Sequence, residues 1–244
     1  MRPPQFDATL PMSARVPLLE VIACSVADAL EAERGGAGRL EVITAFERGG
    51  LTPPAELVRD ILAVVNVPVR VMLRESDGFG VRGDAEAERL CAAARELSEL
   101  GVDGVVLGFV RERAVDVALT ARILSCAPRL RATFHHAFEE TGDQVEAVRE
   151  LKSIGQVDRI LSHGGRGDWA RKSERLAVYQ RAAEPEITVL AGGGVDAKVI
   201  ERLLKAGMIH EFHVGRAARE GGAVSAARVR ELIGVMRRPP PESN

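Results

Sequence analysis

Residues 18–43 read LLEVIACSVADALEAERGGAGRLEVI, and this stretch contains one strand, one helix and the next strand. The run Leu18–Ala23 is rich in aliphatic residues, which is typical of a buried β-strand. Ser25 is a preferred N-cap residue and opens the amphipathic stretch Ser25–Arg34, which predicts a helix. The second strand is expected over Arg39–Ile43, so the stretch forms one strand–helix–strand unit.

The same strand–helix unit recurs along the rest of the chain. The predicted strands are Leu18–Ala23, Arg39–Ile43, Val69–Leu73, Gly104–Gly108, Arg131–His135, Arg159–His163, Ile187–Ala191 and Glu211–Gly215. The predicted helices are Ser25–Arg34, Pro54–Val64, Asp84–Leu100, Asp116–Cys126, Asp143–Ser153, Ser173–Ala183, Asp196–Ala206 and Ser225–Met236. Eight such units predict an α/β fold, a single (β/α)8 TIM barrel whose working site lies at the C-terminal ends of its strands.

An open doubly wound sheet is the alternative fold, since it also alternates strands with helices. Its dinucleotide fingerprint, Gly-x-Gly-x-x-Gly after the first strand, is absent from this sequence. The even spacing of the eight units therefore favours a closed barrel.

Length and composition agree with one such domain. The chain has 244 residues, near the roughly 250 residues of a typical barrel. We expect the barrel to span residues 17–236, between flexible tails at residues 1–16 and 237–244. The 33 lysines and arginines nearly balance the 35 acidic residues, so the net charge of −2 predicts neither nucleic acid nor a membrane surface as partner.

The chain has three cysteines, Cys24, Cys91 and Cys126, which are widely spaced. An odd set of this kind is not a disulfide framework and indicates a cytoplasmic location. Cys91 and Cys126 fall on predicted helices, where cysteine is usually a small buried hydrophobic residue. Cys24 follows the first strand and is a weak candidate for a metal ligand at the barrel mouth.

Charged residues interrupt strands that a parallel barrel normally fills with apolar side chains. They are Glu20, Glu41, Arg70, Arg74, His135, His163 and His213. Charged groups at the C-terminal ends of barrel strands usually take part in chemistry, so Arg74, His135 and His163 are candidate catalytic residues. Glu20 and Glu41 lie deeper, where catalysis and a buried ion network are both open interpretations. For Arg70 and His213 a structural role is favoured, and His136 is expected to point away from His135.

Glycines follow the last two predicted strands. Gly193 and Gly194 come after the seventh strand, and Gly215 and Arg216 come after the eighth. In many barrels these two loops hold a phosphate through backbone N–H groups, and Arg216 adds a charge-assisted contact. The alternative is that the glycines only permit tight turns. We therefore predict an anion site here.

Several segments together resemble the CutC family of copper-homeostasis proteins. They are Leu18-Leu-Glu-Val21, Gly35-Gly-Ala37, Arg39-Leu-Glu41, Gly49-Gly-Leu-Thr-Pro53, Thr133-Phe-His135, Ala137-Phe138, Asp158-Arg-Ile-Leu161 and Ala191-Gly-Gly-Gly-Val195. The resemblance runs from about Leu18 to His213 and implies a barrel, a cytoplasmic location and frequently a homo-oligomer. It also implies copper handling.

The sequence departs from the family pattern at the thiols that copper would use. Ile43 stands where the family often has a cysteine after its second strand. Copper(I) prefers thiolate and thioether ligands, and only Cys24 and Met72 are expected near the mouth. A harder metal such as zinc or manganese could use His135, His163 and a glutamate, but no H-x-H or H-E-x-x-H spacing supports it. Binding of copper(I) or of a divalent metal remains an open possibility, and no cofactor is predicted.

Two functions remain open. The first is an isomerase or lyase that acts on a phosphorylated or carboxylated small molecule. Glu41 or Glu20 would be its general base, His135 and His163 would move protons, and Arg74 would hold a carboxylate or an enolate-like charge. The second is a copper(I)-binding protein without catalysis.

Overall fold

Eight parallel strands close into a barrel in the computed structural model, which describes residues 16–238. The barrel strands are β1 (Leu18–Ala23), β2 (Arg39–Val42), β3 (Val69–Met72), β4 (Gly104–Leu107), β7 (Arg131–Phe134), β8 (Val157–Ser162), β9 (Thr188–Ala191) and β10 (Glu211–Val214). Each strand pairs with the next one in this order, and β10 closes the barrel by pairing with β1 in parallel. The predicted (β/α)8 barrel is confirmed.

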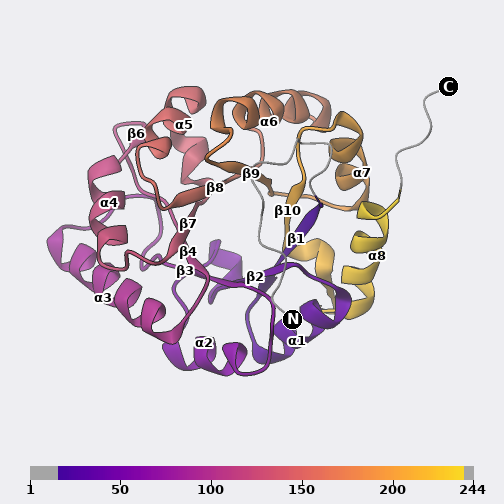
Figure 1. Cartoon of the computed structure of the whole chain (residues 1–244), viewed down its shortest axis with the longest axis horizontal. Helices are drawn as coiled ribbons and strands as arrows, with labels where there is room; N and C mark the ends of the chain where they lie inside the picture. The colour runs from indigo at the N-terminus through magenta and orange to yellow at the C-terminus, as the bar shows by residue number, and fades with distance from the viewer. Residues whose placement is uncertain (1–15, 239–244) are drawn as a thin grey trace.

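The helices form a ring outside the strands, as Figure 1 shows in a view through the barrel. They are α1 (Val26–Gly35), α2 (Ala55–Leu62), α3 (Asp84–Leu100), α4 (Val117–Ser125), α5 (Gln144–Lys152), α6 (Trp169–Ala183), α7 (Ala197–Ala206) and α8 (Ala226–Met236). The Ser25 side chain accepts the Asp28 N–H at the start of α1, as the sequence predicts. Helix α6 begins four residues earlier than predicted, because Asp168 caps it by accepting the Arg171 N–H.

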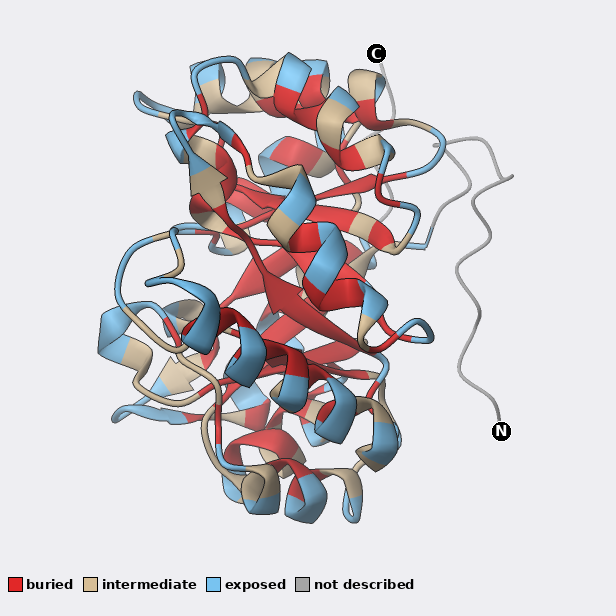
Figure 2. Cartoon of the chain, turned by 90° about the vertical axis from the view of Figure 1, so that its left-hand side faces the viewer, coloured by how far each residue is buried: buried red, intermediate tan, exposed pale blue. Residues whose placement is uncertain are grey.

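The apolar core lies between the strands and the helices, and the inside of the barrel is charged. Leu19, Val21 and Leu40 are fully buried and belong to this core. Their neighbours Glu20 and Glu41 are equally buried but point to the other face of the sheet, because side chains alternate along a strand. Figure 2 shows the strands buried and the outer faces of the helices exposed.

Most barrel strands end one residue before the predicted end. Strand β7 ends at Phe134 rather than His135, and β8 ends at Ser162 rather than His163. The chain turns into a loop at this point, so both histidines lie at the rim of the barrel.

Three short 3₁₀ helices and two small hairpins shape that rim, and none of them was predicted. The 3₁₀ helices are η2 (Phe46–Arg48), η3 (His136–Glu140) and η4 (Arg216–Ala218). The hairpins are β5 (Val110–Arg111) with β6 (Ala114–Val115) and β11 (Arg219–Glu220) with β12 (Ala223–Val224).

The barrel elements run from Leu18 to Met236. The tails predicted at residues 1–16 and 237–244 lie almost entirely outside the described residues. Within residues 16–238, none of the helices has the length and apolar character needed to cross a membrane.

Candidate functional site

A cavity of about 450 Å³ opens at the C-terminal ends of the strands. Most of the predicted site residues line it, namely Glu41, Arg74, His135, Gly193, Gly194, Gly215 and Arg216. His136 and His213 line it as well. Glu20, His163 and Cys24 are not among its lining residues.

Glu41 is a carboxylate of the cavity wall, and it is only 2 % exposed. Its nearest charged neighbour is His213, whose Nε2 lies 3.6 Å from the Glu41 Oε2. Burial raises the pKa of Glu41 to about 7, with a further contribution from the Glu20 charge. A carboxyl group with this pKa can accept or release a proton near neutral pH, which is the requirement for a general base.

His213 lies between the two strand glutamates, a position that the sequence alone did not indicate. Its Nδ1 is 2.8 Å from the Glu20 Oε1, while its Nε2 faces Glu41. Burial favours the neutral ring, but the charges of Glu41 and Glu20 outweigh burial and raise the pKa of His213. His213 therefore links the cavity to the ion network inside the barrel.

His135, which the sequence predicts to move protons, uses one ring nitrogen to accept a backbone hydrogen bond. Its Nδ1 accepts the backbone N–H of Ala137 at 3.2 Å, so in the neutral ring the hydrogen is on Nε2. That Nε2 is buried and has no hydrogen-bond partner among the described residues. Burial, with the nearby Arg74 charge, lowers the pKa of His135 to about 3. The ring is therefore neutral at physiological pH and offers one N–H to a ligand.

The tautomer of His135 can be checked directly by NMR. We expect its Nε2 to carry the hydrogen and its Nδ1 to remain unprotonated from pH 8 down to about pH 4. The measurement is a long-range ¹⁵N–¹H spectrum of the labelled protein, which has five histidines to assign. A His135→Gln variant identifies the signal. An imidazolium spectrum for His135 at pH 6 would contradict this assignment.

His136 lines the cavity, so the expectation that it points away from His135 is wrong. The strand alternation stops at Phe134, and η3 turns the backbone so that both residues line the cavity. The His136 Nδ1 is also buried without a partner among the described residues. Burial, with the charges of His213 and His163, lowers the pKa of His136 to about 3.

His163 lies beside the cavity but is not one of the residues that line it. Its Nδ1 lies 3.1 Å from the carbonyl oxygen of Gly165, and its ring centroid lies 5.6 Å from that of His136. A Cβ at Gly193 would lie 2.6 Å from the His163 Cβ, so only glycine allows this close approach. The position of His163 supports the glycine loop and the His136 ring.

Arg74 presents a positive charge at the cavity rim. Its guanidinium donates to the carbonyl oxygens of Gly50 at 3.2 Å and Gly78 at 3.3 Å, and it lies over the Phe79 ring. Among the described residues no carboxylate forms an ion pair with it. Carbonyl contacts orient the group without neutralising it, which leaves its charge available to an anion.

The predicted anion loops also meet at the cavity. Gly193 and Gly194 have φ angles of +68° and +95°, a left-handed conformation that favours glycine. The Arg216 side chain is 83 % exposed, and its nearest acidic partner is Glu47 at 3.5 Å. An exposed pair of this length contributes little to stability, so Arg216 is free to turn toward a ligand.

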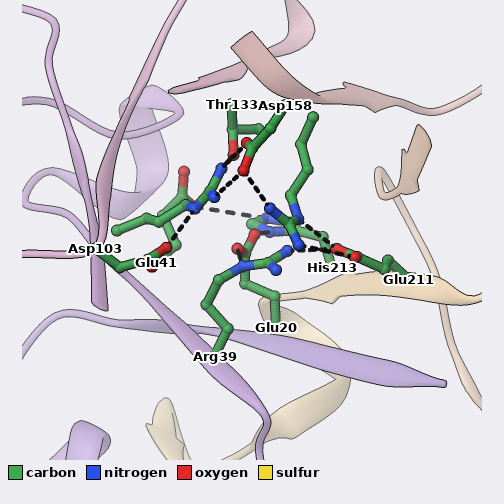
Figure 3. Close-up of polar contacts among 10 residues, drawn as sticks. Glu20, Arg39, Glu41, Asp103, Thr133, Asp158, Glu211 and His213 are labelled. Atoms are coloured by element: carbon green, nitrogen blue, oxygen red, sulfur yellow. Dashed lines mark hydrogen bonds and ion pairs between the residues drawn. The ribbon is translucent and has the colours of Figure 1, made fainter. Parts of the chain in front are cut away.

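A chain of buried ion pairs fills the barrel below the cavity (Figure 3). It starts where Arg39 pairs with Glu20 and, at 2.8 Å, with Glu211. It continues through Arg159, which lies 2.7 Å from both Glu211 and Asp158. Because Glu20 also contacts His213, this chain connects the cavity to the opposite end of the barrel.

Arg70 completes the network at the N-terminal end of the barrel. It pairs with Asp158 at 2.7 Å and Asp103 at 3.0 Å, and it donates to the Thr133 hydroxyl at 2.8 Å. The structural role predicted for Arg70 agrees with these contacts. The network holds one more carboxylate than guanidinium groups, which favours a positive charge on His213.

The donors near Cys24 do not fit a copper(I) site at the mouth. The Cys24 thiol contacts the Arg219 guanidinium at 3.6 Å, a cation that would repel a metal ion. Burial raises the pKa of Cys24, so the thiol keeps its proton. Within residues 16–238 no group of three or more histidine, cysteine or acidic residues is arranged to hold a metal. Met72, the other soft donor, lines the cavity as expected and belongs to a small apolar cluster with Ile43 and Val106.

The fold and the site together define a (β/α)8 barrel protein with a cavity at its C-terminal mouth that charged and histidine side chains line. The CutC family profile matches residues 17–218, and the chain belongs to the CutC family. A CutC family protein of Xylella fastidiosa (strain Temecula1) is 34% identical over 211 residues, which cover 84% of this chain and 78% of that protein.

A mammalian relative and a solved structure agree with this assignment. The copper homeostasis protein cutC homolog of Mus musculus is 32% identical, over 84% of this chain and 76% of the mouse protein. The crystal structure of the putative copper homeostasis protein CutC from Streptococcus agalactiae superposes with a TM-score of 0.75 at 24% identity. It covers 82% of this chain and 98% of the streptococcal chain, and it supports the barrel fold.

Proposed function

We propose that this CutC family protein is an enzyme that moves a proton next to a carbonyl group in a small anionic molecule, as an isomerase or lyase does. One observation carries the proposal. The same cavity holds a carboxyl group with its pKa raised to about 7, Glu41, and a neutral imidazole with an unpartnered N–H, His135. A base beside an electrophilic hydrogen-bond donor is the arrangement that enolisation needs.

In this mechanism Glu41 removes the proton from the carbon next to the substrate carbonyl. The electron pair moves into the carbonyl oxygen, where the His135 Nε2–H stabilises the developing negative charge. An isomerase then returns the proton to a neighbouring atom, and a lyase expels a leaving group from the adjacent carbon. His213, positively charged beside Glu41, favours the carboxylate form of the base.

The anionic group of the substrate would bind at the rim of the cavity. Arg74 would hold a carboxylate, since its guanidinium is oriented by carbonyl groups and carries an unpaired charge. Gly193, Gly194, Gly215 and Arg216 would hold a phosphate through backbone N–H groups and one guanidinium. The substrate is thus a phosphorylated or carboxylated carbonyl compound.

Deuterium exchange tests the proposal across a whole class of compounds at once. The protein is incubated in D₂O with a panel of phosphorylated and carboxylated carbonyl compounds, and mass spectrometry follows the carbon-bound hydrogens. We expect catalysed exchange in at least one compound, at the carbon next to its carbonyl group. A protein that neither exchanges any compound nor gains thermal stability from phosphate or carboxylates would contradict the proposal.

Copper(I) binding at the mouth without catalysis is the second candidate, and the family favours it. Two mammalian relatives carry the name copper homeostasis protein cutC homolog. That function requires Cys24 as a ligand, so loss of copper(I) binding in Cys24→Ser, together with no exchange activity, would favour it over the enzyme.

A further inference from the structure

One side of the cavity is apolar, and the mechanism proposed above does not use it. Ile43, Met72 and Val106 form a buried cluster, and Ile22 and Phe46 are half-buried and pack against it. All of these residues except Val106 line the cavity. We call the four that line it, Ile22, Ile43, Phe46 and Met72, the apolar wall.

The strands place the apolar wall beside the proposed base, Glu41. Ile43 follows Glu41 by two residues, and its N–H still bonds to β1, at 3.1 Å from the Ala23 carbonyl oxygen. Side chains two positions apart along a strand lie on the same face of the sheet. On β1, Ile22 pairs in register with Glu41. A substrate carbon within reach of the Glu41 carboxylate therefore lies next to aliphatic side chains.

The two cations of the rim flank the apolar wall. The Arg74 guanidinium donates to the Gly50 carbonyl oxygen at 3.2 Å, and a Cβ at Gly50 would lie only 3.1 Å from the Met72 Cε. Gly50 thus touches both the cation and the wall. On the other side, the Arg216 guanidinium lies 5.9 Å from the centre of the Phe46 ring. An anion that binds at the rim therefore has the apolar wall next to it.

The chemistry of the wall determines which substituents a ligand can place there. Three of its four side chains are hydrocarbon, and the Met72 thioether is only a weak hydrogen-bond acceptor. A hydroxyl group pressed against such a surface loses its water without gaining a partner, which is unfavourable. An alkyl or aryl group removes apolar surface from water on both sides of the contact, which is favourable.

We infer that the small molecule of this cavity is an oxo acid that carries an alkyl or aryl group. Its carboxylate binds the Arg74 guanidinium, and its apolar group packs on the apolar wall. The inference rests on the proposed function, because that function supplies the carbonyl group and the carbon from which Glu41 removes a proton. It narrows the substrate class to apolar oxo acids and excludes polyhydroxylated compounds such as sugar phosphates.

Binding of simple acids tests the apolar wall separately from catalysis. The probes are the straight-chain carboxylates from acetate to pentanoate, which have no ketone group. The ¹³C-methyl NMR signal of Met72 in the full chain reports their binding, and a Met72→Leu variant identifies this signal among the five methionines. We expect the affinity to rise about fourfold with each added methylene group. A hydroxylated butanoate binds more weakly than butanoate itself.

Threonine substitutions place a hydroxyl group in the wall. Ile43→Thr and Ile22→Thr reduce the rise to about twofold or less for each methylene group. Val178→Thr, at a 41 % exposed position on α6, is the matched control and keeps the wild-type rise. If Ile43→Thr fails to fold by circular dichroism, the half-buried Ile22 carries the test.

The outcomes separate this inference from the proposed enzyme. The same affinity for every chain length, or an undiminished rise in Ile22→Thr, overturns the inference even when the deuterium panel shows exchange. Exchange confined to polyhydroxylated compounds overturns it as well. An affinity that rises with chain length, without deuterium exchange in any compound, contradicts the enzyme and supports the apolar binding site.

Discussion

Replacing Glu41 with glutamine lowers kcat/KM about 10²–10⁴-fold, the usual contribution of a general base. Glutamine has the shape of the protonated glutamic acid but cannot accept a proton. Burial already favours the neutral form of Glu41, so the substitution leaves the barrel as stable as before. The measurement is the rate of deuterium exchange into the compound that the panel identifies, with thermal unfolding followed in parallel.

The pH profile separates a catalytic role of Glu41 from a structural one. Only the ionised carboxylate accepts a proton, so wild-type kcat/KM rises tenfold per pH unit up to about pH 7 and then levels off. The residual activity of Glu41→Gln lacks this rise. Glu99→Gln, an exposed position on α3, keeps both the rate and the profile of the wild type. An unchanged rate in Glu41→Gln, or the same rise in that variant, would exclude Glu41 as the base.

Replacing Arg39 with methionine lowers the free energy of unfolding by about 3–5 kcal/mol, the effect expected when one partner of a buried ion pair is removed. Arg39 is 2 % exposed and contacts both Glu20 and Glu211, so its loss leaves two buried carboxylates without their shared cation. Urea unfolding at pH 7 measures the change. Arg34→Met is the matched control, because within residues 16–238 Arg34 pairs only with Glu31, at the surface. Its replacement costs less than about 1 kcal/mol.

The loss of unfolding free energy in Arg39→Met depends on pH. The ion pairs of Glu20 and Glu211 determine whether this loss grows or shrinks as the pH falls. Arg159 and Arg39 outweigh burial and hold the pKa of Glu211 at about 2, and Glu20 is likewise held below its usual range. These carboxylates stabilise the wild type above the unfolded pKa of about 4.5, and their contribution is lost as the pH falls. The deficit of the variant is therefore largest near pH 7 and shrinks below about pH 4.5. A deficit that grows in acid would contradict this account.

Much of the candidate site could be predicted from strand ends alone. The position of Arg74 and His135 at the ends of two strands predicts that both lie at the mouth, and both line the cavity. For Glu41 the sequence leaves a catalytic and a structural role open, because it does not show whether a buried carboxylate has a cation beside it. Glu20 pairs with Arg39 and has a lowered pKa, whereas Glu41 has no guanidinium partner among the described residues and has a raised pKa.

Strand periodicity, helix caps and family motifs are local patterns that each segment carries, so the sequence predicts both the barrel and the family. Which polar groups meet depends instead on how distant segments pack together. His213 reaches Glu20 across 193 positions of the chain, and Arg70 reaches Asp158 across 88 positions. Such pairs depend on barrel closure and strand register, where a shift of one residue reverses the direction of every side chain.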